Sequence, residues 1–178
     1  GNCCPTFLGG SSGPQRMASV VFDSNAHGTG VKMSNFHVSG EGSALANAGL
    51  HQDRAYFEVT IKKLGRFSIG VCNHRKPEQL GKSLKECGGW AADQTALRGV
   101  KENDVIGCAF DQMELPCCHF FLNGRKMDAA SVRGVRGLVY PAVSVSGGAE
   151  LEVNFGPSHF KHPPPQGFSP VMHAQSMI

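Results

Sequence analysis

The sequence predicts an all-β fold, a two-sheet antiparallel β-sandwich. Three observations favour it: short stretches that alternate apolar and polar residues, a turn signal after nearly every stretch, and no convincing helical period. More than ten short strands of this kind pack best as two sheets stacked face to face. The chain has 178 residues, 23 of them Gly and only 17% charged, which suits strands joined by tight turns.

The first half of the chain supplies short strands and one long connection. Residues 19–23 and 30–34 form strands separated by a turn at 25–28. Residues 55–62 alternate, so Ala55, Phe57, Val59 and Ile61 should face the core and Tyr56, Glu58, Thr60 and Lys62 the solvent. Residues 66–72 repeat this alternation, and residues 73–89 have no strand character.

The second half contains the clearest strand signals. A strand runs near Trp90, the only Trp, whose ring we expect in the core. Residues 104–111 are apolar on both faces, which predicts an interior strand. Asn123-Gly124 between apolar runs predicts a type I′ hairpin. Residues 139–146 and 149–155 predict a second hairpin over Gly147-Gly148, with Glu150 and Glu152 on its solvated face.

Composition separates one domain from two tails. Residues 1–18 are rich in Gly, Ser, Pro and Cys and read as a flexible tail, residues 19–170 as the domain, and residues 171–178 as a C-terminal tail. The odd number of Cys, seven, and the absence of a secretory hydrophobic region favour a reducing, cytoplasmic setting. No apolar run approaches the roughly 20 residues of a membrane-spanning helix.

Charge and ligand patterns predict neither nucleic acid nor a metal as a partner. The net charge is only +3 and the basic residues are scattered, whereas nucleic-acid binding needs a basic stripe. Cys117-Cys118-His119 lacks a second ligand pair at zinc spacing, so we expect these cysteines to be buried small apolar groups and expect no metal and no cofactor.

The order of the motifs resembles the SPRY (B30.2-like) domain family. Four motifs carry the likeness: Asp104–Cys108, Phe121–Gly124, Tyr140–Ser144 and Val153–Gly156. The likeness covers residues 19–168. It implies a bent, concanavalin-like sandwich whose edge loops hold a peptide segment of another protein, and it implies no catalysis. Residues 89–93 lack the fuller aromatic run of the peptide-binding members, so the peptide preference of those members should not be transferred.

The resemblance also implies where a partner would bind. By position along the chain, the pocket-lining places of the family correspond to Phe36 and His37, to Lys82, Ser83 and Leu84, and to Ser146, Gly147 and Gly148. The long loop adds His74 and Arg75, because loops displayed on rigid strands commonly carry recognition residues. Leu84 or Phe36 would be the apolar anchor.

The first residues predict a lipid anchor. Gly1 has the free amine that N-myristoylation requires if it follows a removed initiator Met, although Pro5 stands where Ser or Thr is usual. One myristoyl chain binds membranes only marginally, so Cys3 and Cys4 would be palmitoylated to supply the second signal. These features predict a non-enzymatic adaptor tethered at the cytoplasmic face of a membrane. A structural subunit of a larger assembly and a glycan-binding lectin are the alternatives.

Overall fold

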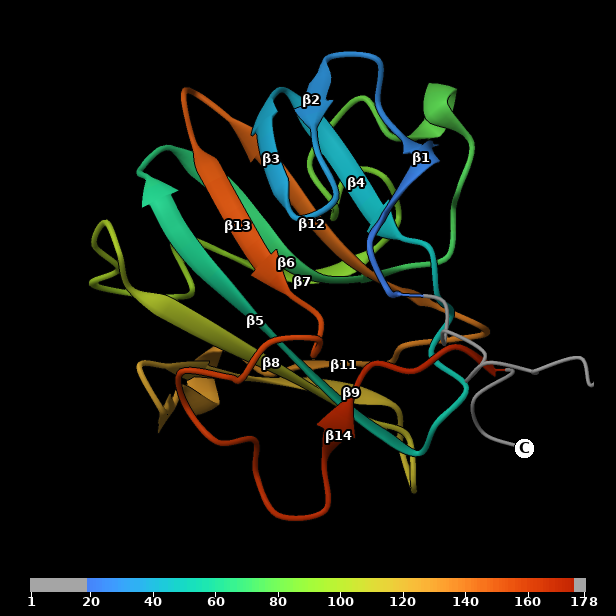
Figure 1. The fold of residues 1–178 in the computed structure, drawn as a ribbon, viewed down its shortest axis with the longest axis vertical. Coiled ribbons are helices and arrows are strands. Elements are labelled where there is room, and N and C mark those ends of the chain that lie inside the picture. The colour runs from blue at the N-terminus through green and yellow to red at the C-terminus, as the bar shows by residue number, and fades with distance from the viewer. Residues whose placement is uncertain (1–18, 175–178) are drawn as a thin grey trace, which may run out of the picture.

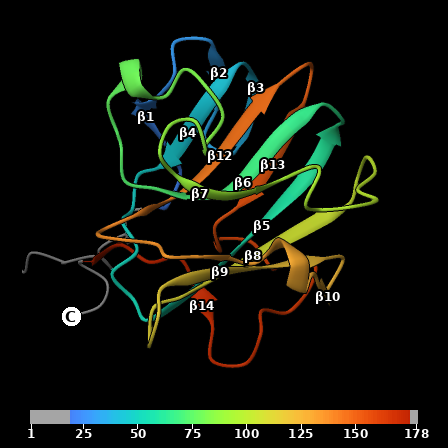
Figure 2. The same ribbon diagram turned by 180° about the vertical axis from the view of Figure 1, so that it is seen from behind.

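The computed structural model describes residues 19–174, and these form two stacked β-sheets, as the sequence predicts (Figures 1 and 2). The first sheet has five strands in the order β1 (Phe22–His27), β4 (Gly42–Ala46), β12 (Tyr140–Ser146), β6 (Arg66–Cys72) and β7 (Trp90–Asp93). The second follows the order β10 (Arg125–Lys126), β9 (Cys117–Leu122), β8 (Val105–Asp111), β5 (Arg54–Lys63), β13 (Glu150–Asn154), β3 (His37–Gly40) and β2 (Val31–Met33).

Two further strands and two helical turns complete the described residues. β11 (Val132–Arg133) pairs with β9, and β14 (Ser169–Pro170) runs parallel to β5. The helical elements among residues 19–174 are short 3-10 helices at Pro77–Gln79 and Asp128–Ala130. No helix in this part of the chain is both long enough and apolar enough to cross a membrane.

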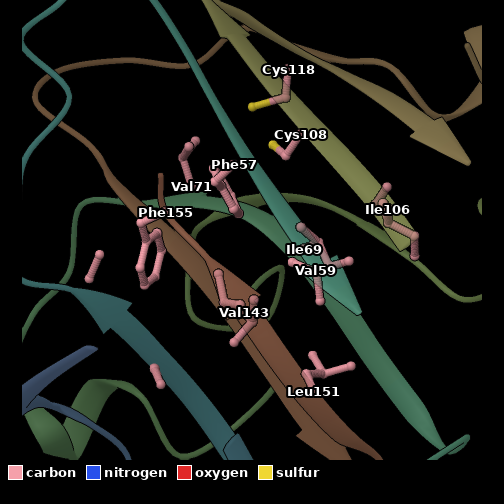
Figure 3. Packing of buried hydrophobic residues seen from close by; sticks show 14 of the residues in the cluster. Phe57, Val59, Ile69, Val71, Ile106, Cys108, Cys118, Val143, Leu151 and Phe155 are labelled. Carbon is pink, nitrogen blue, oxygen red and sulfur yellow. The ribbon is translucent and has the colours of Figure 1, made fainter. Parts of the chain in front are cut away.

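The core lies between the two sheets and takes side chains from both (Figure 3). Phe57, Val59 and Ile61 of β5 are buried as the alternation predicts. Their counterparts on the five-stranded sheet include Ile69 of β6 and Val143 of β12. Each such side chain contributes about 1.5–3 kcal/mol when it leaves water, so this layer is the main source of stability. Trp90 is half-buried and packs against this core, partly as expected.

The predicted interior strand and the Asn-Gly hairpin are confirmed. β8 is buried on both faces from Val105 to Phe110: Ile106, Cys108 and Phe110 face the core, and the Tyr56 side chain covers Gly107 on the opposite face. Asn123 and Gly124 have φ angles of 49° and 85°, which are the positive values that a type I′ turn needs. The turn joins β9 to β10, and the backbone N–H of Val105 donates to Asn123 Oδ1 at 2.9 Å.

The predicted hairpin over Gly147-Gly148 is wrong. β12 pairs with β4 and β6 in one sheet, whereas β13 pairs with β3 and β5 in the other. Both glycines do form a tight turn, with φ angles of 61° and 87°. The turn crosses between the layers, because Val143 and Val145 on one strand and Leu151 and Val153 on the next all reach the same core.

The predicted turn at residues 25–28 is also wrong in its bounds. β1 continues through Ala26 to His27, and a register irregularity separates the pairs Phe22–Ala46 and His27–Ala44. Ala26 is buried in a second apolar cluster on the outer side of the five-stranded sheet. Because Ala26 packs into this cluster, the strand continues through residues whose types favour a turn.

The long loop at residues 73–89 closes that second cluster. Leu80, Leu84 and Cys87 of the loop pack against Leu45 and Cys72 of the sheet. The loop is thus fixed to the sheet by its own apolar side chains rather than projecting into solvent.

The C-terminal segment covers part of the nine-stranded sheet. Tyr56 and Glu58 point away from the core as expected, but they are only 2% and 3% exposed, so the prediction that they meet solvent is wrong. Phe160 packs edge-on against Tyr56, with ring centroids 4.9 Å apart. The Glu58 carboxylate accepts the backbone N–H groups of Lys161 and His162 at 2.8 and 2.9 Å. Burial raises the pKa of Tyr56 above its usual range.

Both ends of the described chain lie at one end of the sandwich. The His173 ring nitrogen Nε2 is 3.3 Å from the Ser19 carbonyl oxygen. Gln52 holds the C-terminal residues by donating to the Pro170 carbonyl and accepting from the Met172 N–H, each at 2.9 Å. Val171 is buried in the core cluster, just beyond the predicted boundary at residue 170.

Candidate functional site

A groove of about 590 Å³ opens on the outer face of the five-stranded sheet, and we call it the five-strand groove. Its floor includes Ser68 of β6 and Ser144 of β12, which are paired in register and share a hydrogen bond between their hydroxyl groups. Gly42 and Ala91 also line it. Small outward-facing residues therefore leave room above this part of the sheet, whereas the apolar loop residues fill the rest.

Charged side chains of both signs surround the floor. Three basic and three acidic residues line the groove: Arg66, Lys82, Lys85, Glu41, Glu86 and Asp93. Within residues 19–174 none of the six forms an ion pair. Glu86 accepts a hydrogen bond from the Ser83 hydroxyl at 2.8 Å, and Asp93 accepts the N–H groups of Thr95 and Ala96, each at 3.0 Å. These charges are available to a ligand with polar groups.

The structure brings three of the predicted binding residues together. Lys82 and Ser83 of the long loop and Ser146 at the end of β12 line the same groove, although they are far apart in the sequence. They meet because β12 pairs with β6 and the loop after β6 folds back over the sheet.

Comparison with known proteins identifies the scaffold. The SPRY domain model matches residues 54–158, which is more than half of the chain. The chain belongs to the SPRY domain family. SPRY domain-containing protein 7 of Gallus gallus is 31% identical over 92% of this chain and 89% of that protein, and its Homo sapiens counterpart is 30% identical over 99% and 95%.

Two further matches are a plant ligase and a solved structure. E3 ubiquitin-protein ligase RKP of Arabidopsis thaliana is 42% identical over 74% of this chain, which corresponds to 11% of the ligase. The crystal structure of a human SPRY domain superposes with a TM-score of 0.56 at 18% identity, covering 74% of this chain and 98% of that one. The structural match shows the SPRY fold. SPRY domains generally mediate protein binding.

Leu84 of this SPRY domain does not reach the groove. Its side chain is fully buried and packs with Leu80 and Cys87 beneath the loop. The expectation that Leu84 anchors a partner does not fit this position, because an apolar side chain in the middle of a loop can equally well attach that loop to its own sheet.

His74 and Arg75 also lie outside the five-strand groove. Arg75 pairs with Asp23, and its guanidinium carbon is 4.0 Å from the centroid of the Tyr140 ring. His74 lies beside Gly88. Arg75 therefore links the loop to β1 and β12, which is a structural role that its sequence position does not reveal.

The remaining predicted residues are dispersed over other surfaces of the SPRY domain. Phe36 lines a small hollow of about 240 Å³ on the nine-stranded sheet, and His37 pairs with Glu152 on β13. Gly147 and Gly148 border a shallow depression that shares only Glu41 with the five-strand groove. These predicted residues therefore lie on surfaces other than the five-strand groove.

Five charged groove residues were missed from the sequence: Glu41, Arg66, Lys85, Glu86 and Asp93. Arg66 had a usable signal, because residues 66 and 68 alternate with the inward Phe67. Glu41 and Asp93 had none, since each is brought to the groove by contacts between strands that are distant in the sequence.

Cys117 and His119 form a second polar cluster, on β9. Residues two apart in a strand share a face, and the Cys117 Sγ lies 3.3 Å from His119 Nε2. His119 Nδ1 is in turn 3.3 Å from the Ser131 hydroxyl. Cys117 is only partly buried, unlike the fully buried Cys118, so the expectation of burial holds for one of the two.

The pKa shifts of Cys117 and His119 run opposite to those of an activated cysteine–histidine pair. Burial, followed by the negative charge of Asp111, raises the pKa of the Cys117 thiol. Burial, followed by nearby Lys126, lowers the pKa of His119. Both groups therefore remain neutral near pH 7, whereas a nucleophilic cysteine needs a lowered pKa. Among residues 19–174 no three His, Cys, Asp or Glu side chains are grouped to hold a metal ion.

Proposed function

We propose that this SPRY domain is a non-enzymatic adaptor that holds an extended segment of a partner protein in the five-strand groove. The observation that carries the proposal is the convergence of Lys82, Ser83 and Ser146 on one groove whose six charged residues have no ion-pair partner among the described residues. The buried sheet beneath makes the floor rigid, so binding costs little ordering of the domain.

The chemistry of the groove favours a polar, mixed-charge segment. Hydroxyl groups can accept from or donate to a peptide backbone, and charges at the rim select partners by electrostatic complementarity more than they add affinity. The apolar contribution is small, because the groove contains no large exposed apolar side chain. A glycan would need an aromatic ring on which to stack, and none of the groove's exposed residues supplies one.

The test is affinity purification from the native cell type with two charge reversals, Lys82→Glu and Arg66→Glu. Both side chains are exposed, so the variants should fold normally, as thermal unfolding will check. A partner identified with the unaltered chain should be lost from both variants and retained by Arg125→Glu, a control at an exposed site on β10. A partner that stays bound to both variants contradicts the assignment of the groove.

The finer proposal is a lipid anchor at Gly1, Cys3 and Cys4, which lie outside the described residues. Two neighbouring acyl signals would hold the adaptor at the cytoplasmic face of a membrane, since a single chain gives only reversible binding. The domain would then present its groove to partners near that surface.

Intact-mass measurement of the protein purified from its own cell tests the anchor. The expected mass exceeds that of the bare chain by one myristoyl and one or two palmitoyl groups. Replacing Cys3 and Cys4 with Ser should move the protein from the membrane fraction to the soluble fraction. A mass equal to the bare chain refutes the anchor and leaves the groove proposal untouched.

A further inference from the structure

A second and larger groove, of about 790 Å³, lies on the outer face of the nine-stranded sheet. We call it the nine-strand groove and define it by Cys117, His119, Met113, Leu115, Arg133 and Arg136. Neighbouring strands place Arg54, Asp111, Cys117 and Arg133 in one row across β5, β8, β9 and β11, so these side chains share a face. The register of the sheet therefore fixes the positions of the groove's polar groups.

Positive charge is in excess in this groove. Arg54 is 3.3 Å from the Asp111 carboxylate and is thereby neutralised. Asp111 also accepts the Met113 N–H at 3.0 Å. Arg133 and Arg136 are exposed and form no ion pair within residues 19–174, and Glu114 is the only other acidic residue that lines the groove.

Apolar side chains stand exposed beside these arginines. Met113 and Leu115 are 55% and 79% exposed, and they supply two of the four large apolar residues that are exposed on the described part of the chain. Both lie in the short connection between β8 and β9. Val135, buried between the two arginines, holds their loop to the domain through its N–H bond to the Pro116 carbonyl at 3.4 Å.

We propose that the nine-strand groove is a second docking surface, which binds an acidic segment of a partner protein with apolar residues next to its carboxylates. Each guanidinium can take a carboxylate in a two-point contact, while Met113 and Leu115 cover the neighbouring apolar side chains. The neutral Cys117 and His119 at the base add hydrogen-bonding groups without opposing the arginines.

This inference rests on the adaptor function and extends it. The two grooves lie on the outer faces of opposite sheets, so the domain can hold two segments at once. A membrane is a poorer occupant of the nine-strand groove, because Glu114 stands between Met113 and Leu115 and would meet anionic lipid.

The test uses a phage-displayed library of random octapeptides against the full chain. The expected peptides carry Asp or Glu next to Leu, Ile, Phe or Met. The dissociation constant of the best peptide, measured by fluorescence anisotropy, should rise about tenfold or more in the double variant Arg133→Glu/Arg136→Glu. It should also rise severalfold in Leu115→Ser, and binding should weaken with added salt.

Matched controls keep the outcome unambiguous. Arg98→Glu and Leu64→Ser alter an exposed arginine and an exposed leucine outside both grooves and should leave binding unchanged. Enriched peptides without acidic residues, an empty selection, or affinity insensitive to the Arg133 and Leu115 changes would overturn the inference. Loss of peptide binding in Lys82→Glu instead would support the five-strand groove and overturn this one. Sedimentation with phosphatidylserine vesicles that depends on Arg133 would assign the surface to a membrane and would likewise overturn it.

Discussion

The buried Glu58 carboxylate attaches the C-terminal segment to β5, and we call this contact the Glu58 clamp. The carboxylate is buried on the outer side of β5, where it accepts two backbone N–H groups from the segment that covers the sheet. A charged acceptor makes hydrogen bonds about twice as strong as a neutral one, and it leaves these two N–H groups satisfied under the cover. One residue thus ties the C-terminal segment to the central strand.

Glu58→Gln should lower the free energy of unfolding by about 1.5–3 kcal/mol, because an amide has one acceptor oxygen for two donors and places an N–H₂ group against the other. Urea unfolding followed by circular dichroism measures the change. Glu152→Gln is the matched control: its carboxylate is exposed and forms only a 3.7 Å pair with Lys62, so the expected change is below about 1 kcal/mol. Equal losses in both variants would contradict the clamp.

Leu84 gives a second prediction at this scale. As a buried residue of the second cluster, Leu84→Ala should cost about 2–5 kcal/mol in stability through lost packing and a residual cavity. The neighbouring Lys82→Ala removes an exposed side chain and should change stability by less than about 0.5 kcal/mol. If Leu84→Ala weakened partner binding while leaving unfolding unchanged, the residue would be a contact and not part of the core.

Turns determine how the strands of this domain are connected. The Asn123-Gly124 turn joins neighbouring strands of one sheet, whereas the Gly147-Gly148 turn sends the chain from one sheet to the other. Both pairs have positive φ angles, so local chemistry predicts a tight turn in each case. It cannot predict whether the strand that follows pairs with the one before, since that depends on which sheet buries the next apolar face.

Gly124→Ala should destabilise the domain by about 1–2 kcal/mol, because its φ of 85° is strained for any residue with a Cβ and the new atom would lie 3.2 Å from His162 Nδ1. Thermal unfolding by calorimetry measures this. Gly81→Ala is the control at an open site with no atom within 4 Å of the added Cβ, and it should be neutral or stabilising by up to about 1 kcal/mol. A neutral Gly124→Ala would refute the turn geometry.

Alternation predicted the elements better than it predicted their surroundings. The inward set of β5 and the whole of β6 follow from period-two patterns, because a strand's two faces are encoded locally. Tyr56 and Glu58 show the limit of the pattern. It predicts correctly that both side chains point away from the core, but the segment that buries them comes from about 100 residues further along the chain. Contacts of such separation leave no local signal.

At the scale of the whole molecule, the same limit applies to the candidate site. Lys82, Ser83 and Ser146 were found from their order in a family-like sequence, and the structure gathers them in one groove. The nine-strand groove went unnoticed because Cys117 and His119 were considered as neighbours in sequence rather than as residues two apart on one face. Its arginines come from β11 and from the loop after β11. No sequence pattern predicts that β11 pairs with β9.

Buried thiols make the stability of the whole domain depend on pH. Burial raises the pKa of Cys72, of Cys108 and of Cys117. In the unfolded chain a thiol loses its proton near pH 8.5, about where free cysteine titrates. Above that pH the unfolded state releases protons that the folded state retains. The contribution of these thiols to the free energy of unfolding is therefore fully present below that pH and is lost as the pH rises through the folded pKa values.

Urea unfolding under reducing conditions should therefore show a falling midpoint between about pH 8 and about pH 9.5. Cys108→Ala removes a fully buried thiol whose pKa burial raises well above its usual value, so it should flatten the decline, whatever it costs in absolute stability. A midpoint that is constant across this range would contradict the shifted pKa values.

The contact between Ser19 and His173 has a consequence for how the domain can be joined to other proteins. Because residues 19 and 173 lie side by side, the domain can be inserted into a surface loop of a host protein without distorting that loop or the domain. For the same reason a short Gly-Ser linker from residue 174 to residue 19, with new termini opened at the exposed Gly147-Gly148 turn, should yield a circular permutant that still folds. Such a permutant would change the order of the strands along the chain while keeping the strand pairing of both sheets.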